Sequence, residues 1–410
     1  MEKEIITQNN FEGLGIEPEF LTILEKLRYL TPTPIQHKAI PVAIQGKDVV
    51  GIAQTGTGKT LAFGIPMIIR LLAMQKNKGL IILPTRELAI QVEEALQKLG
   101  RSFGLKTAVL IGGASMGFQI KQIRNGAHII IGTPGRINDH LQQKTLRLDT
   151  VAILVLDEAD LMLDMGFAPQ IKQILLSVPK ERQTMLFSAT MPKEIMHIAT
   201  TYMKLPVRVE IAPPGTASEK VEHELFFVRR DQKMTLLQKL LQEYKGSVLV
   251  FTRTKHGAKK ICDQILNMNF KASQIHSNRS LSQRREALDG FKSGKYRILV
   301  ATDIASRGID VKGIELVVNF DLPDGAGDYV HRIGRTGRAG ITGKAVSLVT
   351  ADQRSKVREI ERLIRSTIPI SQMEGMPYVE PSRAEYVSAK SFHRPFKKPY
   401  NKGKFGGKRY

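Results

Sequence analysis

The sequence predicts an α/β protein of two tandem domains, each a mostly parallel β-sheet flanked by helices. Two observations predict this fold class. Short continuous runs of β-branched residues and leucine alternate with helical stretches, a pattern typical of parallel strands that are buried on both faces. The length of 410 residues suits two to three domains, and a hydrophobic content of 42% is enough to build folded cores.

The predicted strands end in turns rich in Gly, Thr or Asp. Ligand sites of parallel sheets lie at the carboxyl ends of the strands, so we expect the polar motifs described below to gather there. In the first half the strands are expected at 48–53, 79–83, 107–111, 128–131, 151–156 and 184–187. In the second half they are expected at 224–228, 247–251, 296–300, 316–320 and 345–348.

The chain divides at a short stretch of proline, glycine and small residues. This stretch, IAPPGTAS at 211–218, predicts a linker between a first domain at 1–210 and a second at 219–367. The strand–helix alternation stops after Thr367, and we expect residues 368–410 to form a disordered basic and aromatic tail.

The charge of the chain favours a polyanionic partner. Lys and Arg number 61 against 39 Asp and Glu, which gives a formal net charge of +22. Nucleic acid and an anionic membrane surface are both compatible with such a field, as is a simple solubility effect. The longest apolar stretch, at 61–74, is interrupted by Arg70 and is too short to cross a bilayer.

The single cysteine, Cys262, excludes a disulfide framework and is compatible with a reducing compartment. The first residues, MEKEIITQNNFEG, contain neither the basic nor the apolar region of a secretory signal. We therefore expect a cytoplasmic protein with no membrane association.

A glycine-rich loop follows the first predicted strand and precedes a helix. Glycines let backbone amides surround a phosphate, Lys59 can reach the terminal phosphates, and Thr60 can hold Mg²⁺. Ala53 stands where the usual phosphate-loop pattern has glycine, but the strand–loop–helix context supports phosphate binding. The loop consists of Ala53, Gln54, Thr55, Gly56, Thr57, Gly58, Lys59 and Thr60.

Three acids, Asp157, Glu158 and Asp160, come directly after the apolar strand VAILVL. One acid here would be an ordinary helix cap. Three acids, about a hundred residues after a phosphate loop, favour nucleoside triphosphate hydrolysis, with Asp157 holding Mg²⁺ and Glu158 orienting the attacking water.

The second half contains a glycine-spaced arginine turn, HRIGRTGR at 331–338. Arginines with no acids nearby indicate either a solvated loop or an anion site, and the glycine spacing favours the anion site. Arg335 and Arg338 could neutralise charge in the transition state of phosphoryl transfer. If they act on a nucleotide held by the first domain, hydrolysis requires the domains to close.

These motifs together resemble the DEAD-box RNA helicases. AQTGTGKT, DEAD, Ser188-Ala189-Thr190 and HRIGRTGR occur in the order and spacing of that family, over about residues 11–365. The resemblance implies two RecA-like domains, ATP and Mg²⁺ as cofactors, and RNA as the partner. It also implies RNA-stimulated ATP hydrolysis and local, non-processive unwinding of short duplexes. Protein partners from ribosome assembly or RNA decay are compatible with it.

The resemblance also implies a role for individual residues. Around the nucleotide, Gln36 would hydrogen-bond the adenine edge, Tyr29 would stack on the base and Phe11 would support the amide, within an adenine-reading segment at 11–36. The remaining nucleotide-facing residues are Asp303 and Asp310, and the coupling residues are Asp160, Ser188, Thr190, His331 and Arg332. The RNA-contacting residues are Pro84, Thr85, Arg86, Gly112, Gly113, Thr133, Pro134, Gly135, Arg136, Arg253, Thr254, Arg284 and Thr302.

Three positions depart from the family pattern. Arg28 replaces the glycine usually found before the stacking aromatic, and could alter the local turn. Leu161 follows the DEAD tetrad, where arginine is frequent. Leu281 occupies the glutamine position of a Gln-x-x-Arg pair and leaves one RNA contact in doubt.

Other functions fit these residues less well. A DNA translocase on the same scaffold would not explain the Gln36 segment. An RNA clamp without ATP turnover would not explain Lys59, Glu158 and the arginine turn. A small-molecule kinase explains neither the second domain nor the charge. Without the resemblance, Phe11 and Tyr29 would be core aromatics, Gly112-Gly113 a bare turn, and the basic tail a solvated terminus.

Overall fold

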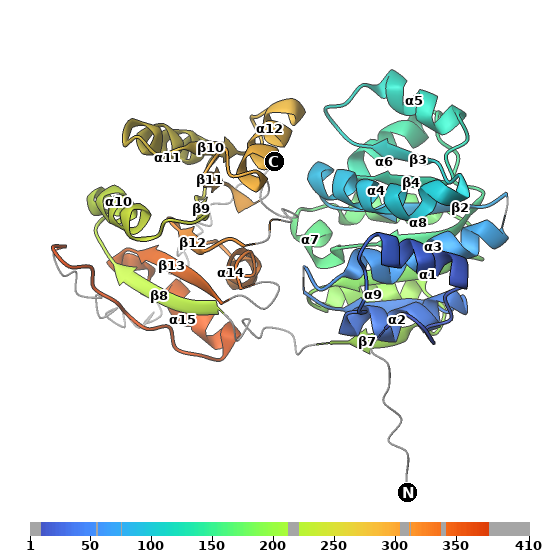
Figure 1. Ribbon diagram of the computed structural model, residues 1–410, viewed down its shortest axis with the longest axis horizontal. Coiled ribbons are helices and arrows are strands. Elements are labelled where there is room, and N and C mark those ends of the chain that lie inside the picture. The colour runs from blue at the N-terminus through green and yellow to red at the C-terminus, as the bar shows by residue number, and fades with distance from the viewer. Residues whose placement is uncertain are drawn as a thin grey trace, which may run out of the picture.

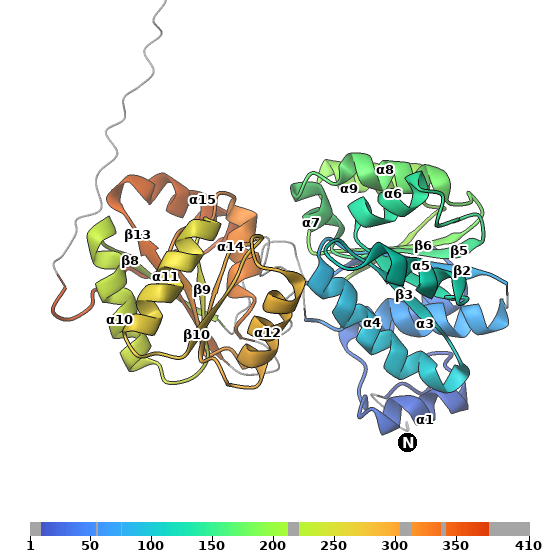
Figure 2. The same cartoon turned by 90° about the horizontal axis from the view of Figure 1, so that it is seen from above.

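The computed structural model describes residues 10–54, 56–74, 76–211, 221–303, 311, 313–337 and 342–376. Two α/β domains lie side by side (Figure 1), and in each of them helices cover both faces of one sheet (Figure 2). All strand pairs described in the two sheets are parallel. The predicted fold class is therefore confirmed.

The first sheet has seven strands in the order β3-β4-β2-β5-β6-β1-β7. Its strands are β1 Val49–Ile52, β2 Lys78–Ile82, β3 Thr107–Leu110, β4 Ile129–Gly132, β5 Val151–Leu156, β6 Gln183–Ser188 and β7 Val207–Glu210. Its helices are α1 Pro18–Lys26, α2 Pro34–Ile44, α3 Lys59–Ala73, α4 Arg86–Gly100, α5 Met116–Arg124, α6 Pro134–Gln142, α7 Ala159–Asp164, α8 Ala168–Ser177 and α9 Lys193–Tyr202, with a 3₁₀ turn at Arg101–Phe103.

The second sheet has six strands in the order β10-β11-β9-β12-β13-β8. Its strands are β8 Val221–Phe227, β9 Val248–Phe251, β10 Ala272–Ile275, β11 Ile298–Ala301, β12 Leu316–Asn319 and β13 Gly343–Val349. Its helices are α10 Lys233–Glu243, α11 Lys255–Asn267, α12 Leu281–Lys292, α14 Ala326–Ile333 and α15 Arg354–Ile364, with 3₁₀ turns at Arg230–Gln232 and Ala351–Gln353.

Each sheet separates two apolar cores, because successive side chains of a strand point to opposite faces. In β2, Ile81 packs with α2, α3 and α4 on one face, whereas its neighbours Leu80 and Ile82 pack with α6, α8 and α9 on the other. The second sheet is covered by α12, α14 and α15 on one face and by α10 and α11 on the other. The long apolar runs in the sequence follow from this two-sided burial.

Strands β7 and β10 were not predicted from the sequence, and both lie at an edge of their sheet. Their sequences, VRVE and ASQI, lack a continuous apolar run. An edge strand has a neighbour on one side only and needs less apolar surface, which removes the signal on which the prediction depended.

The tail was predicted to begin at residue 368, which is too early in the chain. Ile368 is buried in the core of the second domain. Beyond it, the Leu225 amide donates to the Pro369 carbonyl at 2.9 Å, and the Ser371 amide donates to the Leu225 carbonyl at 2.8 Å. The chain therefore adds a short pairing to β8 before the described residues end at 376. The predicted linker from 212 onward and the tail from 377 lie outside the described residues.

Candidate nucleotide and RNA sites

The glycine-rich loop runs from β1 into the first turn of α3. Its start is fixed by the Ala53 amide, which donates to the Ser188 carbonyl at 3.0 Å. Within the loop the Thr57 hydroxyl donates to the Gln54 carbonyl at 2.7 Å. Gly58 has a φ of 93°, and a Cβ there would lie 2.3 Å from Nε2 of Gln36. Only glycine fits this position, and Thr55 lies outside the described residues.

Lys59 begins α3 and is buried against two of the predicted acids. Its Nζ lies 2.7 Å from Oε1 of Glu158 and 3.8 Å from Oδ1 of Asp157. Burial alone would lower the pKa of Lys59, but the charges of Glu158 and Asp157 outweigh burial and raise it above its ordinary value. The lysine is therefore a cation held by carboxylates in a water-poor site.

Burial affects the pKa of Asp157, and the backbone of Glu158 is unusual. Burial raises the pKa of Asp157 to about 7, against the opposing effect of Lys59 and with a further contribution from Glu158. Glu158 has a φ of 52° and a ψ of 50°, a left-handed conformation that carries strain in a residue with a side chain. The site thus combines a strained acid with surplus negative charge around one lysine.

The amide of Gln36 connects the N-terminal segment to the glycine-rich loop. Its Oε1 accepts from the Thr33 amide at 2.9 Å, and its Nε2 donates to the Gly58 carbonyl at 2.9 Å. The side chain is 2% exposed. This pairing leaves one N–H and one lone pair of the amide for an adenine edge.

The two aromatics of the N-terminal segment differ in exposure. Phe11 belongs to the first-domain core, whereas Tyr29 is 36% exposed. Arg28 adopts a φ of 61°, the conformation that the more usual glycine would take without strain. Arg28 thus adopts the left-handed conformation in this turn, and an altered turn relative to the glycine-bearing pattern stays a prediction.

The last acid of the tetrad holds the segment that follows β6. Oδ2 of Asp160 accepts from the amide and the hydroxyl of Thr190, at 2.9 and 2.8 Å. The Asp160 amide donates to the Ser188 hydroxyl at 3.2 Å. The three residues expected to couple the sites in the first domain therefore lie in one network.

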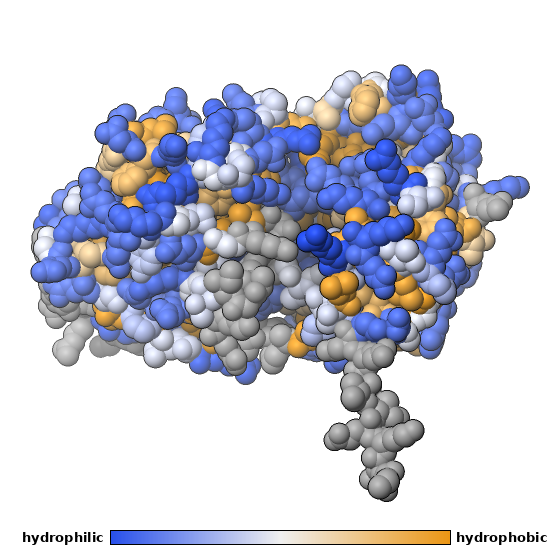
Figure 3. All heavy atoms as spheres, viewed as in Figure 1, coloured by the Kyte–Doolittle hydropathy of each residue, from blue (hydrophilic) through white to orange (hydrophobic). Residues whose placement is uncertain are grey.

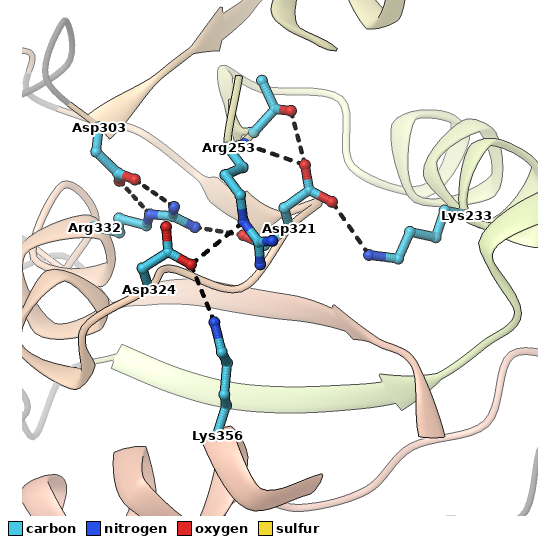
Figure 4. Close-up of polar contacts among 8 residues, drawn as sticks. Lys233, Arg253, Asp303, Asp321, Asp324, Arg332 and Lys356 are labelled. Atoms are coloured by element: carbon cyan, nitrogen blue, oxygen red, sulfur yellow. Dashed lines mark hydrogen bonds and ion pairs between the residues drawn. The ribbon is translucent and has the colours of Figure 1, made fainter. Parts of the chain in front are cut away.

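In the second domain, Arg332 of α14 reaches the carboxyl ends of the central strands (Figure 4). It forms a two-bond pair with Asp303, Nε to Oδ1 at 2.5 Å and Nη2 to Oδ2 at 2.7 Å. Its Nη1 donates to Oδ1 of Asn319 at 3.2 Å and to the Asp321 carbonyl at 2.6 Å, and its guanidinium lies 5.0 Å from the centre of the Phe251 ring.

The arginine turn is described only in part. Arg335 is 4% exposed, and its Nε donates to the His331 carbonyl at 3.3 Å. Arg338 and Asp310 lie outside the described residues. The structure describes four of the predicted groups on the nucleotide side of this domain: the nucleotide-facing Asp303, the coupling residues His331 and Arg332, and the catalytic Arg335.

The predicted RNA residues of the first domain lie at the carboxyl ends of β2, β3 and β4. Thr85 caps α4, its hydroxyl accepting from the Leu88 amide at 3.3 Å. The Arg86 guanidinium packs so closely on Gly112 and Gly113 that a Cβ on Gly113 would lie 2.6 Å from Arg86 Nη1.

Neighbouring residues complete this edge. Pro134 and Gly135 form the first turn of α6, which follows Thr133. Arg136 Nη1 donates to the Ala114 carbonyl at 3.3 Å. Pro84 ends the strand segment before Thr85. The structure thus brings arginines, backbone amides and hydroxyls together along one edge, the donor types that contact phosphates.

The second-domain RNA residues separate into two groups. Arg253 is exposed, the Thr254 hydroxyl caps α11 by accepting from the Gly257 amide at 3.0 Å, and Thr302 follows β11. Arg284 instead is buried, and its Nη2 lies 2.8 Å from Oε2 of Glu87 in the first domain. The guanidinium predicted to contact RNA is therefore occupied by an ion pair between the domains.

The same end of α12 makes two further contacts with the first domain. Leu281, at the usual glutamine position, packs against the first-domain core. Arg285 lies 3.8 Å from Glu94 of α4. The departure at 281 thus replaces a polar group with an apolar contact across the domains.

Sequence reasoning missed two functional candidates, Lys233 and Asp321, which were not singled out. Glu87 falls within the motif PTRELA at 84–89, which was interpreted as RNA-contacting, but it was given no role of its own. Asp321 follows the apolar strand β12 closely, the same pattern that drew attention to Asp157, so its position could have been found. The partnership of Glu87 with Arg284 joins positions 197 residues apart and had no local signal.

The surface in Figure 3 is mostly hydrophilic, with small separate hydrophobic patches. Among the described residues, no helix is both long and apolar enough to cross a bilayer. The same residues contain no group of three His, Cys, Asp or Glu side chains that could hold a metal ion.

Known proteins share both halves of the sequence. A DEAD/DEAH box helicase family model matches residues 33–198, and a helicase conserved C-terminal domain model matches 232–340. The chain is 40% identical to the ATP-dependent RNA helicase DbpA of Bacillus subtilis, covering 94% of this chain and 81% of that protein. It is 43% identical to the DEAD-box ATP-dependent RNA helicase CshA of Geobacillus kaustophilus, covering 86% and 76%.

Solved structures agree with these relatives. The fold matches Dbp5 of S. cerevisiae bound to RNA and ADP BeF3 with a TM-score of 0.80 at 28% identity, covering 88% of this chain and 95% of that one. A DEAD box protein from Methanococcus jannaschii matches with a TM-score of 0.53 at 39% identity, covering 88% and 99%. The chain belongs to the DEAD-box ATP-dependent RNA helicases, a family of RNA-stimulated ATPases.

Proposed function

We propose that this protein uses ATP hydrolysis, controlled by closure of its two domains on RNA, to separate short RNA duplexes locally and to remodel RNA–protein complexes. The observation that carries the proposal is the buried Lys59, held 2.7 Å from Glu158 and 3.8 Å from Asp157 at the start of α3. Such a cation can exchange its carboxylate partner for the terminal phosphates of ATP.

Each residue of this group has a distinct proposed task. Lys59 binds the terminal phosphates and, in leaving Glu158, frees that carboxylate. Glu158 then orients the attacking water, and its unusual backbone directs the side chain toward the glycine-rich loop. Gln36, already bonded to Gly58, reads the adenine edge with its remaining donor and acceptor, while Tyr29 stacks on the base.

Mg²⁺ is the proposed metal, held by the Thr60 hydroxyl and the Asp157 carboxylate. Both are oxygen donors next to the phosphate loop, the type Mg²⁺ prefers. Two protein groups suffice because phosphate oxygens and water complete its shell. This agrees with the absence of a three-ligand cluster among the described residues. When bound, the metal would neutralise phosphate charge.

The domain arrangement supports a closure mechanism. A single-residue variant of Dbp5 bound to RNA and ADP BeF3 matches with a TM-score of 0.80, whereas the same variant bound to Gle1 and IP6 matches with 0.72. The higher score thus belongs to the complex bound to RNA and ADP BeF3. We propose that the Glu87–Arg284 ion pair and the Leu281 contact stabilise the closed arrangement, in which Arg335 and Arg338 reach the nucleotide.

RNA is proposed to lie along the carboxyl ends of both sheets, contacted through its backbone. In the first domain the contacts come from the turn around Arg86 and Gly113, and in the second from Arg253, Thr254 and Thr302. Backbone contacts of this kind carry little sequence preference. Cytoplasmic location and partners from ribosome assembly or RNA decay remain predictions.

The proposal is tested by phosphate release with matched single-stranded RNA and DNA and with ATP and GTP. We expect hydrolysis to be stimulated by RNA and ATP together, and a labelled short RNA duplex to be separated only when ATP is present. Equal stimulation by DNA would favour a DNA translocase. RNA binding without turnover would favour a clamp. Equal hydrolysis of GTP would exclude adenine reading by Gln36.

A further inference from the structure

Asp321 lies at the carboxyl ends of three neighbouring strands of the second sheet, β11, β9 and β12. It follows β12, whose last residue, Asn319, is in register with Phe251 at the end of β9. On the other side of β9 lies β11, which leads to Asp303. Figure 4 shows Asp321 between Lys233 and the turn that holds Arg253, with Arg332 and Asp303 beside it.

The Asp321 carboxylate holds the turn that follows β9. Its Oδ2 accepts from the Thr252 hydroxyl at 2.9 Å and from the Arg253 amide at 3.1 Å. Thr252 is 1% exposed, so its hydroxyl has no ready exchange with water. These two bonds fix the direction in which Arg253 leaves the sheet.

Lys233 holds the same carboxylate from the opposite side. Its Nζ lies 3.5 Å from Oδ1 of Asp321 and donates to the Phe320 carbonyl at 2.6 Å. Burial alone would raise the pKa of Asp321, but Lys233 and the donors of Arg253 and Thr252 lower it below its ordinary value. The acid is thus ionised and oriented by groups on both sides.

The main chain of the same residue faces the nucleotide side. The Asp321 carbonyl accepts from Nη1 of Arg332 at 2.6 Å, and Arg332 in turn binds both carboxylate oxygens of Asp303. One residue therefore contacts the turn of Arg253 through its side chain and the arginine helix α14 through its backbone.

We propose that Asp321 is a positioning residue that couples RNA binding at the Arg253 turn to the arginine helix on the nucleotide side. The inference rests on the proposed function, which places RNA at Arg253 and ATP opposite α14. A shift of the Arg253 turn must move Asp321 or break its two bonds, and a shift of Asp321 displaces the Arg332 contact. Coupling of this kind is reciprocal between the two ligands.

Asp321→Asn tests the proposal, with Asp324→Asn as the matched control. Asp324 lies three residues further on, is 72% exposed, and pairs with Lys356 at 3.1 Å and Arg253 at 3.5 Å. The measurement is the affinity for a fluorescent single-stranded RNA with and without a non-hydrolysable ATP analogue. The ratio of the two affinities is the coupling. We expect Asp321→Asn to reduce it about tenfold, and Asp324→Asn to keep it within about twofold.

Two further variants separate positioning from mere stability. Lys233→Met combined with Asp321→Asn removes the uncompensated lysine, and should recover thermal stability while the coupling stays low. Thr252→Val keeps both charges and removes one bond to the carboxylate, and should reduce the coupling about threefold. It remains informative if Asp321→Asn does not fold.

The outcomes are distinct. Coupling within about twofold of wild type in both Asp321→Asn and Thr252→Val, or recovery of coupling together with stability in the double variant, overturns the positioning role. If the RNA affinity of the wild-type protein is the same with and without the ATP analogue, the proposed function itself is wrong. Low coupling in the Asp321 variants with normal nucleotide affinity supports the inference.

Discussion

Each domain holds a buried cation at the carboxyl edge of its sheet, Lys59 in the first and Arg332 in the second, and these two cations are bound in opposite ways. Among the described residues, the ion-pair partners of Lys59 are two carboxylates, at 2.7 and 3.8 Å, so that the acids outnumber the lysine. Arg332 uses four of its N–H bonds on Asp303, Asn319 and the Asp321 carbonyl, and packs on the Phe251 ring.

The difference separates a cation that can change its partner from one that is fixed in its place. Burial is nearly the same, with exposed fractions of 5% for Lys59 and 2% for Arg332. The partners differ. An ammonium among surplus carboxylates can move to a phosphate and leave a stable anionic site behind, whereas a guanidinium with almost every donor satisfied loses several bonds by moving.

The largest expected effect is on turnover in the first domain. Glu158→Gln keeps the size of the side chain but removes the carboxylate that orients water, so the ATPase rate should fall by about two to four orders of magnitude. ATP binding should survive, and the complex with RNA and ATP should become long-lived. Single-turnover phosphate release measures the effect.

The surface variant Glu243→Gln of α10 serves as the control for Glu158→Gln. It carries the same substitution on an exposed acid of the second domain. Its turnover should stay near that of wild type. Unchanged steady-state hydrolysis in Glu158→Gln would remove the proposed task of Glu158.

The second effect is on stability and compares the two cations directly. Arg332→Met removes the two-bond pair with Asp303 and the bonds to Asn319 and Asp321, and should destabilise the second domain by about 3–5 kcal/mol. Lys59→Met should cost much less in unfolding experiments, because Asp157 can take up a proton in its place, yet it should abolish hydrolysis. Equal losses of stability in urea unfolding would contradict the distinction.

The third effect is a pH dependence of stability that is expected from Asp157 in the first domain. Burial raises the pKa of Asp157 to about 7 from an ordinary value of 3.8, so the folded protein binds a proton that the unfolded chain releases. Wild-type stability contributed by this group is therefore lost as pH rises from about 4 to about 7. Asp157→Asn lacks this loss and should become the more stable protein near neutral pH.

Asp303→Asn provides the comparison in the second domain. Asp303 gives Arg332 a two-bond pair, so its loss should destabilise the protein by about 2 kcal/mol or more at every pH tested. Thermal unfolding from pH 4.5 to 8 measures both variants. If Asp157→Asn is destabilised by as much as Asp303→Asn at pH 8, the first site has no surplus of negative charge.

Some strands and site residues of the two domains could be predicted from the sequence and others could not, for physical reasons. Strands buried on both faces have continuous apolar runs and were found, whereas the edge strands β7 and β10 have none and were missed. Lys59, Asp157 and Glu158 come from short local motifs. The strain at Glu158 and its bond to Lys59 depend on how β1 and β5 lie in the sheet, which no local pattern shows.

Contacts between distant segments were the least predictable. Arg284 was expected on RNA but pairs with Glu87, because the position of α12 against α4 depends on the domain arrangement. Asp321 has a recognisable place after a strand, yet its partners Thr252, Lys233 and Arg332 come from three other elements. Sequence therefore predicts which groups are available, and packing determines which of them are already occupied.

The smallest expected effect concerns two arginines with left-handed backbones, one in each domain. Arg28 has a φ of 61° and precedes Tyr29, and Arg365 has a φ of 54° at the end of α15. The left-handed conformation costs a residue with a side chain about 1–2 kcal/mol, and glycine avoids this cost. Glycine also gives the unfolded chain more backbone freedom, which takes back about 0.5–1 kcal/mol of the gain.

Replacing either arginine with glycine should therefore stabilise the protein by roughly 0.5–1 kcal/mol. The two variants should differ in nucleotide binding. Arg365→Gly lies far along the chain from the adenine-reading segment and should leave ATP affinity unchanged. Arg28→Gly loosens the turn that presents Tyr29 and should change ATP affinity by about twofold to threefold, as measured by titration with a fluorescent ATP analogue. Equal ATP affinity in both variants would mean that the turn at Arg28 supports the fold alone and that Tyr29 is positioned by the remainder of its segment.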